Sequence, residues 1–389
     1  ASEYSLIKPI ENSIFLTHYS SNVLPYMWLM TLPVNFLLVT WFNRFLDKRG
    51  PWRMFVVTSC ITMGLHILLA FFVKQVPQLC WVHNIWKDLY ILLMLQQLWS
   101  LVHLQARLKE AKYLYSILFG MGGLGSICGS LVPSFLATRM GSEMLLLVPI
   151  VIFALLGLVF WQVIRFGAVI DPASQEAKSK VTVSTLKSAF TSPTLRYIVM
   201  IVVLMQVAAT LLDFTFNTKM AEVFPFQDVR SAQMGKVWGA INISNLLVQF
   251  VGSLFLIHRL GIKRCHLLLP VLLLGSSASV VLLPGVASLI MGFASIKVFD
   301  YSLFNLLKEM LYVPLSPYEK KNVKAVVDIF AYRSSKGIAS FLVIGLQTFF
   351  ASSVMALCCW SVLMLFGSWV LLSLFYFRAS GSLSAVYAE

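Results

Sequence analysis

The chain has 389 residues, of which 59% are hydrophobic and only 12% are charged, and its mean hydropathy is +0.82. This composition excludes a soluble globular protein, in which about 25% of residues are charged. The formal net charge of +14 would suggest nucleic-acid binding in a soluble protein. Here, however, Lys and Arg gather in alternate connections between apolar segments, as membrane orientation requires. We therefore expect the lipid bilayer as solvent and no nucleic-acid partner.

The apolar segments are long enough to be membrane-spanning helices. One crossing takes about 20 residues, so the chain accommodates about twelve spans, and long apolar runs without period-2 alternation do not fit barrel strands. The first predicted helix is short, so either the chain lacks the opening of that helix or the helix crosses only in part. The predicted helices cover residues 3–18, 23–43, 54–73, 84–106, 112–136, 144–164, 195–222, 232–256, 266–283, 285–309, 324–349 and 353–377.

A long polar connection divides the chain into two equal halves. We predict a six-helix bundle over residues 1–166, a cytoplasmic linker over 167–193, a second six-helix bundle over 194–379 and a cytoplasmic tail over 380–389. Basic residues follow the second, fourth, sixth, eighth and tenth predicted helices, which places these connections and both termini in the cytoplasm.

A basic turn recurs at corresponding places in the two halves. Residues 43–53 after the second predicted helix are echoed by residues 258–264 after the eighth, which indicates an internal repeat. The first turn retains Asp47, a basic pair and Gly50, and resembles the G-x-x-x-D-R-x-G-R-R motif of major-facilitator transporters, although Asn43 replaces the leading glycine. The resemblance implies an all-α polytopic membrane protein with the major-facilitator fold.

Sequence motifs of enzymes and of cofactor or metal sites are not found. Residues 120–125 fit G-x-G-x-x-G, but they lie in an apolar helical run and follow no strand, so we expect close helix packing there, with Gly125 and Gly129 as a GxxxG pair. The chain has no Walker A, HExxH or paired-cysteine pattern, and we expect no enzyme activity, cofactor or metal. The histidines are expected in loops or helix interfaces, with His103 kept as a possible pathway residue.

Charged side chains inside the predicted spans are the main functional candidates, because each costs about 3 kcal/mol or more at the bilayer centre unless it is paired or hydrated. The alternative is permanent structural pairing, for example of Lys297 with Asp300. The candidate substrate-binding residues are Lys8, Glu11, Asp213, Asn217, Lys297, Asp300 and Lys336. The candidate gating residues, nearer the cytoplasmic ends, are Lys308, Glu309, Asp328 and Arg333.

The spacing of these residues indicates a shared polar interior. Gln206, Thr210, Asp213 and Asn217 fall on one face of a helix, and such a stripe cannot face lipid. At about 1.5 Å per residue, three lysines but only one aspartate lie near mid-membrane, which favours an anionic substrate. These residues are Lys8, Lys297, Lys336 and Asp300.

One block of the second half resembles the ATP/ADP exchange transporters of plastids and obligate intracellular bacteria, together with their wider bacterial relatives. The block runs from Lys308 to Leu315 as K-E-M-L-Y-V-P-L and continues with K-A-V-V-D at 324–328 and K-G at 336–337. The resemblance implies exchange of nucleotides, with basic residues neutralising the phosphates. The chain departs from the family at Glu11, where a phosphate-facing cation is usual, and its Asp213 and Asn217 resemble the wider relatives.

We therefore expect a bacterial inner-membrane carrier, a monomer, that moves a small anion such as ATP or ADP by alternating access. Lys8, Lys297 and Lys336 would hold the anion, while Asp213 and Glu11 would recognise polar groups or couple a proton. Two alternatives remain: the same fold carrying a lipid, peptide or drug-like solute, and a non-transporting membrane scaffold.

Overall fold

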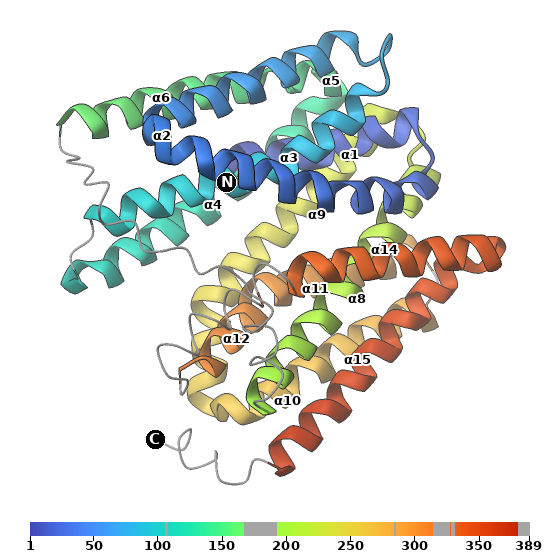
Figure 1. Cartoon of the computed structure of the whole chain (residues 1–389). Coiled ribbons are helices and arrows are strands. Elements are labelled where there is room, and N and C mark those ends of the chain that lie inside the picture. Colours follow the sequence, from blue (N-terminus) through green and yellow to red (C-terminus); the bar gives the residue numbers. More distant parts are fainter. Residues whose placement is uncertain (106–107, 167–192, 284, 314–326, 328–330, 380–389) are drawn as a thin grey trace. The chain divides into compact units, whose positions relative to one another are not determined.

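All the regular structure is helical in the part of the chain that the computed structural model describes (Figure 1). The described residues are 1–105, 108–166, 193–283, 285–313, 327 and 331–379. Within them the backbone alone is described at positions 36, 39–40, 42–51, 96, 99–105, 108–116, 163–164, 166, 251–254 and 379. The expected linker apart from Pro193, the expected tail, Asp328 and the side chain of His103 therefore lie outside the described part.

The chain forms two compact units. Unit 1 comprises Ala1–Val23, Met30–Ala177 and Met220–Gly239. Unit 2 comprises Leu24–Leu29, Lys178–Lys219 and Ala240–Glu389.

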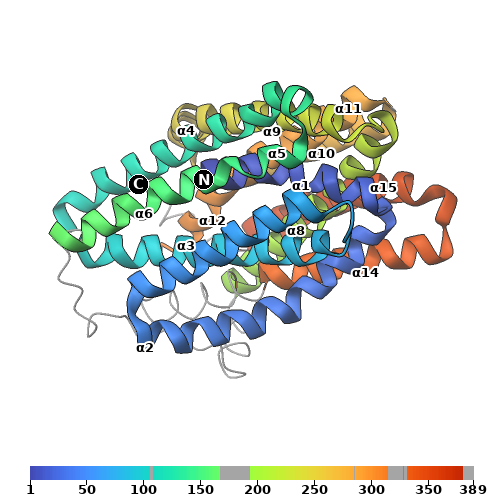
Figure 2. The same ribbon diagram turned by 90° about the horizontal axis from the view of Figure 1, so that it is seen from above.

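The helices of unit 1 follow the predicted order, with one difference. Residues expected to form two helices and a turn lie in one stretch that is helical throughout, α2 (Leu24–Phe72). Figure 2 shows this stretch doubling back on itself, so the expected antiparallel pair of spans is retained. The other helices are α1 (Ser2–His18), α3 (Leu79–Gln105), α4 (Leu108–Met140), α5 (Ser142–Leu145) and α6 (Val148–Phe166).

Small residues bring α1 and α4 together, as the glycine-rich segment predicted. A Cβ atom added to Gly129 would lie 2.0 Å from the backbone oxygen of Ser2, and one added to Gly125 would lie 3.5 Å from the backbone nitrogen of Ser2. Only a residue without a side chain permits this approach of two helix backbones. The expectation of close packing, rather than of a nucleotide-binding loop, is therefore confirmed.

Unit 2 is built largely from helices that are interrupted by wider or kinked turns. The polypeptide turns at Gly261 (φ 74°, ψ 163°), inside the repeated basic segment at which the sequence predicts a connection between helices. Two π-helical segments interrupt the others, at Val248–Gly252 and Asp300–Phe304. The α-helices of the second half of the chain are α8 (Pro193–Val223), α9 (Gln227–Leu247), α10 (Ser253–Leu282), α11 (Val286–Phe299), α12 (Asn305–Leu311), α14 (Tyr332–Phe349) and α15 (Val354–Ala379). The end of α8 and most of α9 belong to unit 1, which includes Met220–Gly239.

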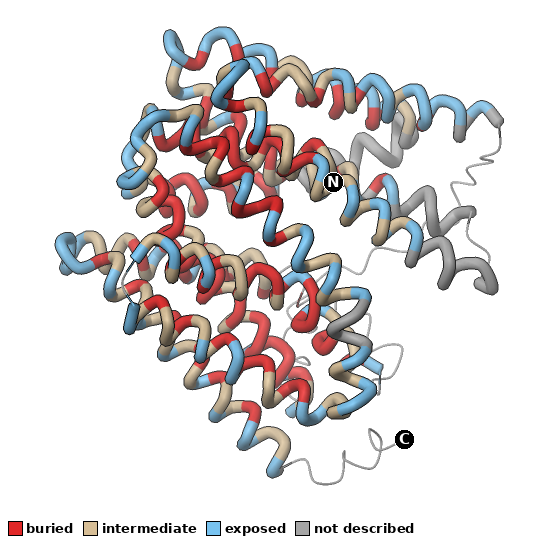
Figure 3. Tube along the Cα trace, turned by 180° about the vertical axis from the view of Figure 1, so that it is seen from behind, coloured by how far each residue is buried: buried red, intermediate tan, exposed pale blue. Residues whose placement is uncertain are grey.

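The distribution of apolar side chains fits a protein surrounded by lipid. Seven helical segments within the described residues are long and apolar enough to cross a bilayer, the shortest having 21 residues. Buried positions lie on the inward faces of the helices of each unit, and exposed positions run along their outer faces (Figure 3). Large apolar side chains are fully or half exposed on these outer faces, among them Leu37, Phe135, Met291, Met364 and Phe375. In water such a surface would aggregate, whereas acyl chains solvate it.

Candidate functional site

The predicted polar stripe of α8 meets two charged residues of a broken helix, which consists of α11, the π-helical segment Asp300–Phe304 and α12. Lys297 Nζ lies 2.6 Å from Asp213 Oδ2, and Gln206 Nε2 donates a hydrogen bond of 3.0 Å to Asp300 Oδ1. The amide of Asn217 is buried and donates to the backbone oxygen of Asp213 at 2.7 Å, one turn earlier. Four of the residues chosen from the sequence are thus gathered in one polar cluster inside unit 2.

The ion pair within this cluster differs from the pairing of Lys297 with Asp300 that the sequence analysis considered. Lys297 pairs with Asp213 of another helix, whereas the carboxylate of Asp300, three residues further along the same helix, accepts from Gln206. Lys297 is 5% exposed, but a quarter of the Asp213 side chain is accessible. An ion-paired lysine whose counter-ion can be reached from outside is suited to exchanging that carboxylate for another anion.

A wider helical turn presents Asp300 to this cluster. Asp300 begins the π-helical segment Asp300–Phe304, in which backbone hydrogen bonds span one residue more than in an α-helix. Such single turns occur often at functional sites because they change the direction of side chains within an otherwise regular helix.

The predicted gating residues lie further along the same chain segment. Lys308 Nζ is 3.8 Å from Glu309 Oε1 and donates to the hydroxyl of Tyr332 on α14 at 3.4 Å. Arg333 is half-buried on α14. With Asp328 outside the described residues, the predicted gating role of these four residues stays a prediction.

The two remaining lysines lie over aromatic rings. Lys8 Nζ is 3.6 Å from the ring centroid of Trp238, and Lys336 Nζ is 5.8 Å from that of Trp28. A cation over an aromatic face gains about 0.5 to 2 kcal/mol, depending on its hydration. Such a contact stabilises a cationic side chain inside a helical bundle.

Glu11 belongs to a second buried polar cluster, which the sequence did not reveal as a whole. Its carboxylate lies 2.6 Å from His83 Nδ1 and 2.6 Å from Lys87 Nζ. His83 in turn contacts His66, which contacts Glu3. Most histidines were expected in loops or helix interfaces, and these two lie at the interface of α1, α2 and α3. The sequence signal for this cluster was the spacing of His83, Lys87 and Tyr90, which lie at steps of four and three residues on one face of α3. A second signal was the pair Glu3 and Glu11, which lie two turns apart on α1.

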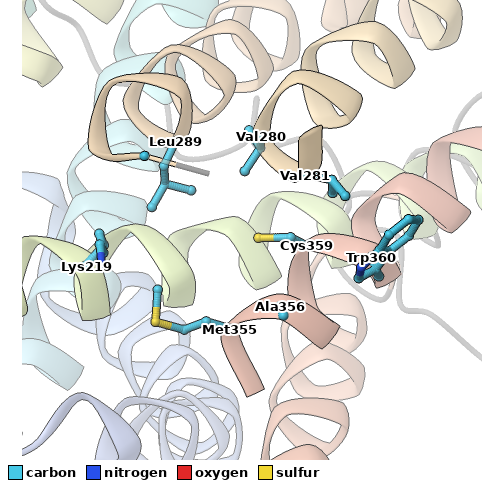
Figure 4. Close-up of a pocket in the computed structure, with 9 residues that line it drawn as sticks. Lys219, Val280, Val281, Leu289, Met355, Ala356, Cys359 and Trp360 are labelled. Atoms are coloured by element: carbon cyan, nitrogen blue, oxygen red, sulfur yellow. The ribbon is translucent and has the colours of Figure 1, made fainter. Parts of the chain in front are cut away.

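An apolar cavity of about 340 Å3 lies at one end of unit 2. Met355 and Cys359 of α15 face Lys219 of α8 and Leu289 of α11 across it (Figure 4). Except for Lys219, its lining is apolar or sulfur-containing: Val280, Val281, Gly285, Leu289, Met355, Ala356, Cys359 and Trp360.

Solved structures of transporters share this architecture over nearly the whole chain. A bacterial homologue of the iron transporter ferroportin, in an inward-facing state, matches with a TM-score of 0.69 and 14% identity, over 96% of this chain and 94% of that one. The nucleoside transporter NupG matches with a TM-score of 0.59 and 13% identity, over 97% of this chain and 93% of that one. These likenesses show that the chain has the fold of these transporters, the major-facilitator fold that the sequence predicted.

A family model adds a more specific likeness in the second half of the chain. The model described as TLC ATP/ADP transporter matches residues 276–375. This confirms the resemblance based on the motifs between Lys308 and Gly337. The matched segment contains the candidate residues Lys297, Asp300, Lys308, Glu309, Asp328, Arg333 and Lys336. The matching family and these structural neighbours are transporters and not enzymes.

Proposed function

We propose that this protein carries a phosphate-bearing anion, of which ATP and ADP are the first candidates, across the membrane by alternating access. The observation that carries the proposal is the TLC match over residues 276–375, since this segment supplies the buried lysine of the Asp213–Lys297 pair. A nucleotide brings two to four negative charges, for which lysine ammonium groups are suitable partners.

In this proposal Asp213 is an exchangeable counter-ion. It keeps Lys297 charged in the empty carrier, and a substrate phosphate takes its place at the Nζ atom. Partial exposure of Asp213 supports this role, because a fully buried partner would not be displaced. Lys336 and Lys8, each over an aromatic ring, are the further predicted anion-binding cations. Asp300 and Asn217 would take part through hydrogen bonds to ribose or base.

The proposed setting is the inner membrane of a bacterium, with both termini in the cytoplasm. The support is the alternation of basic connections along the sequence, which concentrates positive charge on the cytoplasmic side. Modification of single introduced cysteines in the terminal segments, with a reagent that does not cross the membrane, tests this orientation in intact cells.

Counterflow in proteoliposomes tests the substrate class. Liposomes containing the full chain and unlabelled ADP should take up labelled ATP or ADP with saturation, and inorganic phosphate and nucleosides serve as competitors. Lys297→Gln should reduce uptake by about tenfold or more, which corresponds to the loss of one charged contact of about 1.4 kcal/mol or more. Lys297→Arg should retain part of it. Lys74→Ala is the matched control, because the Lys74 side chain is 76% exposed at the end of α2. If no nucleotide is taken up with saturation, this substrate class is rejected.

A second candidate is an amphiphilic solute such as a lipid or a drug-like molecule. The apolar cavity beside Lys219 favours it, because a hydrocarbon tail fits such a lining and a lysine suits an acidic head group. Uptake or efflux of a fluorescent amphiphile that is lost in Cys359→Trp but kept in Lys297→Gln would favour this candidate over the nucleotide.

A further inference from the structure

A continuous chain of buried polar groups joins α1, α2 and α3 inside unit 1. Glu3 Oε1 lies 3.2 Å from His66 Nε2, His66 Nδ1 lies 2.7 Å from His83 Nε2, and His83 Nδ1 lies 2.6 Å from Glu11 Oε1. Both rings thus use both of their nitrogens. The two histidines and Glu11 are at most 2% exposed and Glu3 is 7% exposed. We call these four residues the proton chain, for the reason that follows.

The number of contacts fixes the number of protons. Each of the three contacts needs one hydrogen between its two heavy atoms, because two bare acceptors at 2.6 to 3.2 Å repel one another. Two neutral imidazoles supply two hydrogens, one each. The third contact is satisfied only if one further proton is bound, either on a ring, giving an imidazolium, or on a carboxylate.

The charges around the chain favour that additional proton. Lys87 Nζ lies 2.6 Å from the second oxygen of Glu11, and its charge offsets one of the two carboxylates. One extra proton offsets the other, so the buried set is neutral with it and negative without it. A low-dielectric interior favours the neutral set.

The other titratable groups near the proton chain do not change this balance of charges. Tyr90 donates its hydroxyl hydrogen to Glu3 Oε2, and Tyr4 and the Cys80 thiol, both uncharged when protonated, also lie within electrostatic reach. Asp88 lies within electrostatic reach of Lys87 but is partly exposed, unlike the four buried residues.

The helices packed against the proton chain place few further charged side chains beside it. From α5, Glu143 faces Lys74 and His18 instead, and α4 meets α1 through glycines. From α6, Phe153 covers the rings of His66 and Tyr90. No group of three or more His, Cys, Asp or Glu side chains within the described residues converges as metal ligands would.

We propose that Glu3, His66, His83 and Glu11 form a proton-binding relay that couples transport to the movement of one proton. The relay moves a proton by two concerted steps. The Nδ1 hydrogen of a doubly protonated His66 passes to His83 Nε2, and the Nδ1 hydrogen of His83 passes to Glu11 Oε1. Both rings end neutral and Glu11 ends as a carboxylic acid, still with one hydrogen in each contact. The positive charge has left His66 and the negative charge has left Glu11.

The proposal rests on the transporter fold and not on the nucleotide as substrate, so its first test uses no substrate. A difference titration compares the purified full chain with His83→Gln, and 15N NMR of histidine-labelled protein follows the ring nitrogens. The wild-type chain should bind one more proton than the variant, with the resonances of His66 and His83 shifting together. His258→Gln, at an exposed position, is the matched control and should leave the linked shifts of the His66 and His83 resonances unchanged.

The second test measures coupling in proteoliposomes, with labelled ADP as the probe. For one proton moved with each substrate, each pH unit of imposed gradient should change the accumulation ratio by about tenfold. In His83→Gln the gradient should lose this effect, while exchange of ADP at equal pH on both sides persists. Glutamine keeps a donor and an acceptor at this position, which limits damage to folding.

The outcomes are distinguishable. If proton binding is unchanged in His83→Gln, or if the two rings titrate independently, the relay is rejected even when ADP is carried. If ADP is not carried but the linked titration is observed, the nucleotide proposal fails and the proton site stands. Displacement of the ring protons by micromolar Zn2+ or Fe2+ would replace the relay with a metal site and overturn the proposal.

Discussion

Lys297 and Asp213, 84 residues apart in sequence, form an ion pair of 2.6 Å between α11 and α8. The pair joins the segment matched by the TLC family model to a helix outside that segment. The lysine is nearly fully buried and the carboxylate is partly accessible, so the two partners are not equivalent. Removing the carboxylate leaves a buried cation, whereas removing the lysine leaves an anion with access to water.

This asymmetry predicts the result of a double-mutant cycle. Asp213→Asn should reduce the free energy of unfolding by about 3 kcal/mol, because an uncompensated buried charge costs about 3 to 5 kcal/mol. Lys297→Met should be less costly, and the double variant should be more stable than the sum of the two changes predicts by about 1 to 3 kcal/mol. Denaturant titration in mixed micelles measures all four proteins. Additive effects would show that the two side chains do not interact in the folded protein.

Arg230 predicts a second large effect on stability. Its guanidinium group donates to Ser13 Oγ, to the backbone oxygens of Ser13 and Phe224, and to Thr17 Oγ1, at 2.6 to 3.1 Å. The residue is 2% exposed. Arg230→Ala leaves the two buried acceptors of Ser13 and two partly buried acceptors without this donor, and should reduce the free energy of unfolding by about 2 kcal/mol or more.

Arg230→Lys tests the geometry of this contact as well as its charge. A lysine ammonium group lacks the planar fork of N–H donors that a guanidinium group has, so it cannot reach acceptors on both α1 and the segment before α9. Lysine should therefore restore only part of the stability. Arg139→Ala, at an exposed position near the end of α4, is the matched control. Equal melting temperatures for Arg230→Ala and Arg139→Ala would contradict the role assigned to Arg230.

The sequence predicted the fold well because membrane-spanning helices leave a local signal. Each span needs a long apolar run, and the turn at Gly261 depends on the backbone conformation of that residue. Spans and turn can therefore be predicted without knowledge of distant residues. The stripe from Gln206 to Asn217 was visible for the same reason, since residues three and four apart share a helix face.

The pairing of the polar residues was not predictable in the same way. Lys297 was considered as a partner of Asp300, its neighbour on one helix, but it pairs with Asp213. The proton chain was missed because its members come from three helices, and the rotation of each helix about its axis is set by packing across the bundle. The residue types alone made His66 look like any interface histidine.

The contact of α1 with α4 predicts that Gly129 tolerates no side chain. Gly129→Ala places its methyl group on the backbone of Ser2, which has no flexible end to move aside, so α1 has to shift. We expect a loss of about 1 to 3 kcal/mol, as for other overpacked sites. Gly122→Ala, with no atom within 4 Å of the added Cβ, is the control and should be neutral or slightly stabilising. Thermal unfolding in detergent distinguishes the two, and equal stability of both variants would contradict this packing.

Gly261 predicts an effect of backbone conformation alone. Its φ of 74° and ψ of 163° lie in a region that side chains rarely permit, yet no atom lies within 4 Å of an added Cβ. Gly261→Ala should therefore reduce the free energy of unfolding by about 1 to 3 kcal/mol through strain, without a clash. Gly275→Ala, in the same helix and equally open, should instead stabilise the helix by up to about 1 kcal/mol. Opposite signs for these two substitutions, measured by unfolding in mixed micelles, are the expected result. A stabilising Gly261→Ala would mean that the chain does not turn at this residue.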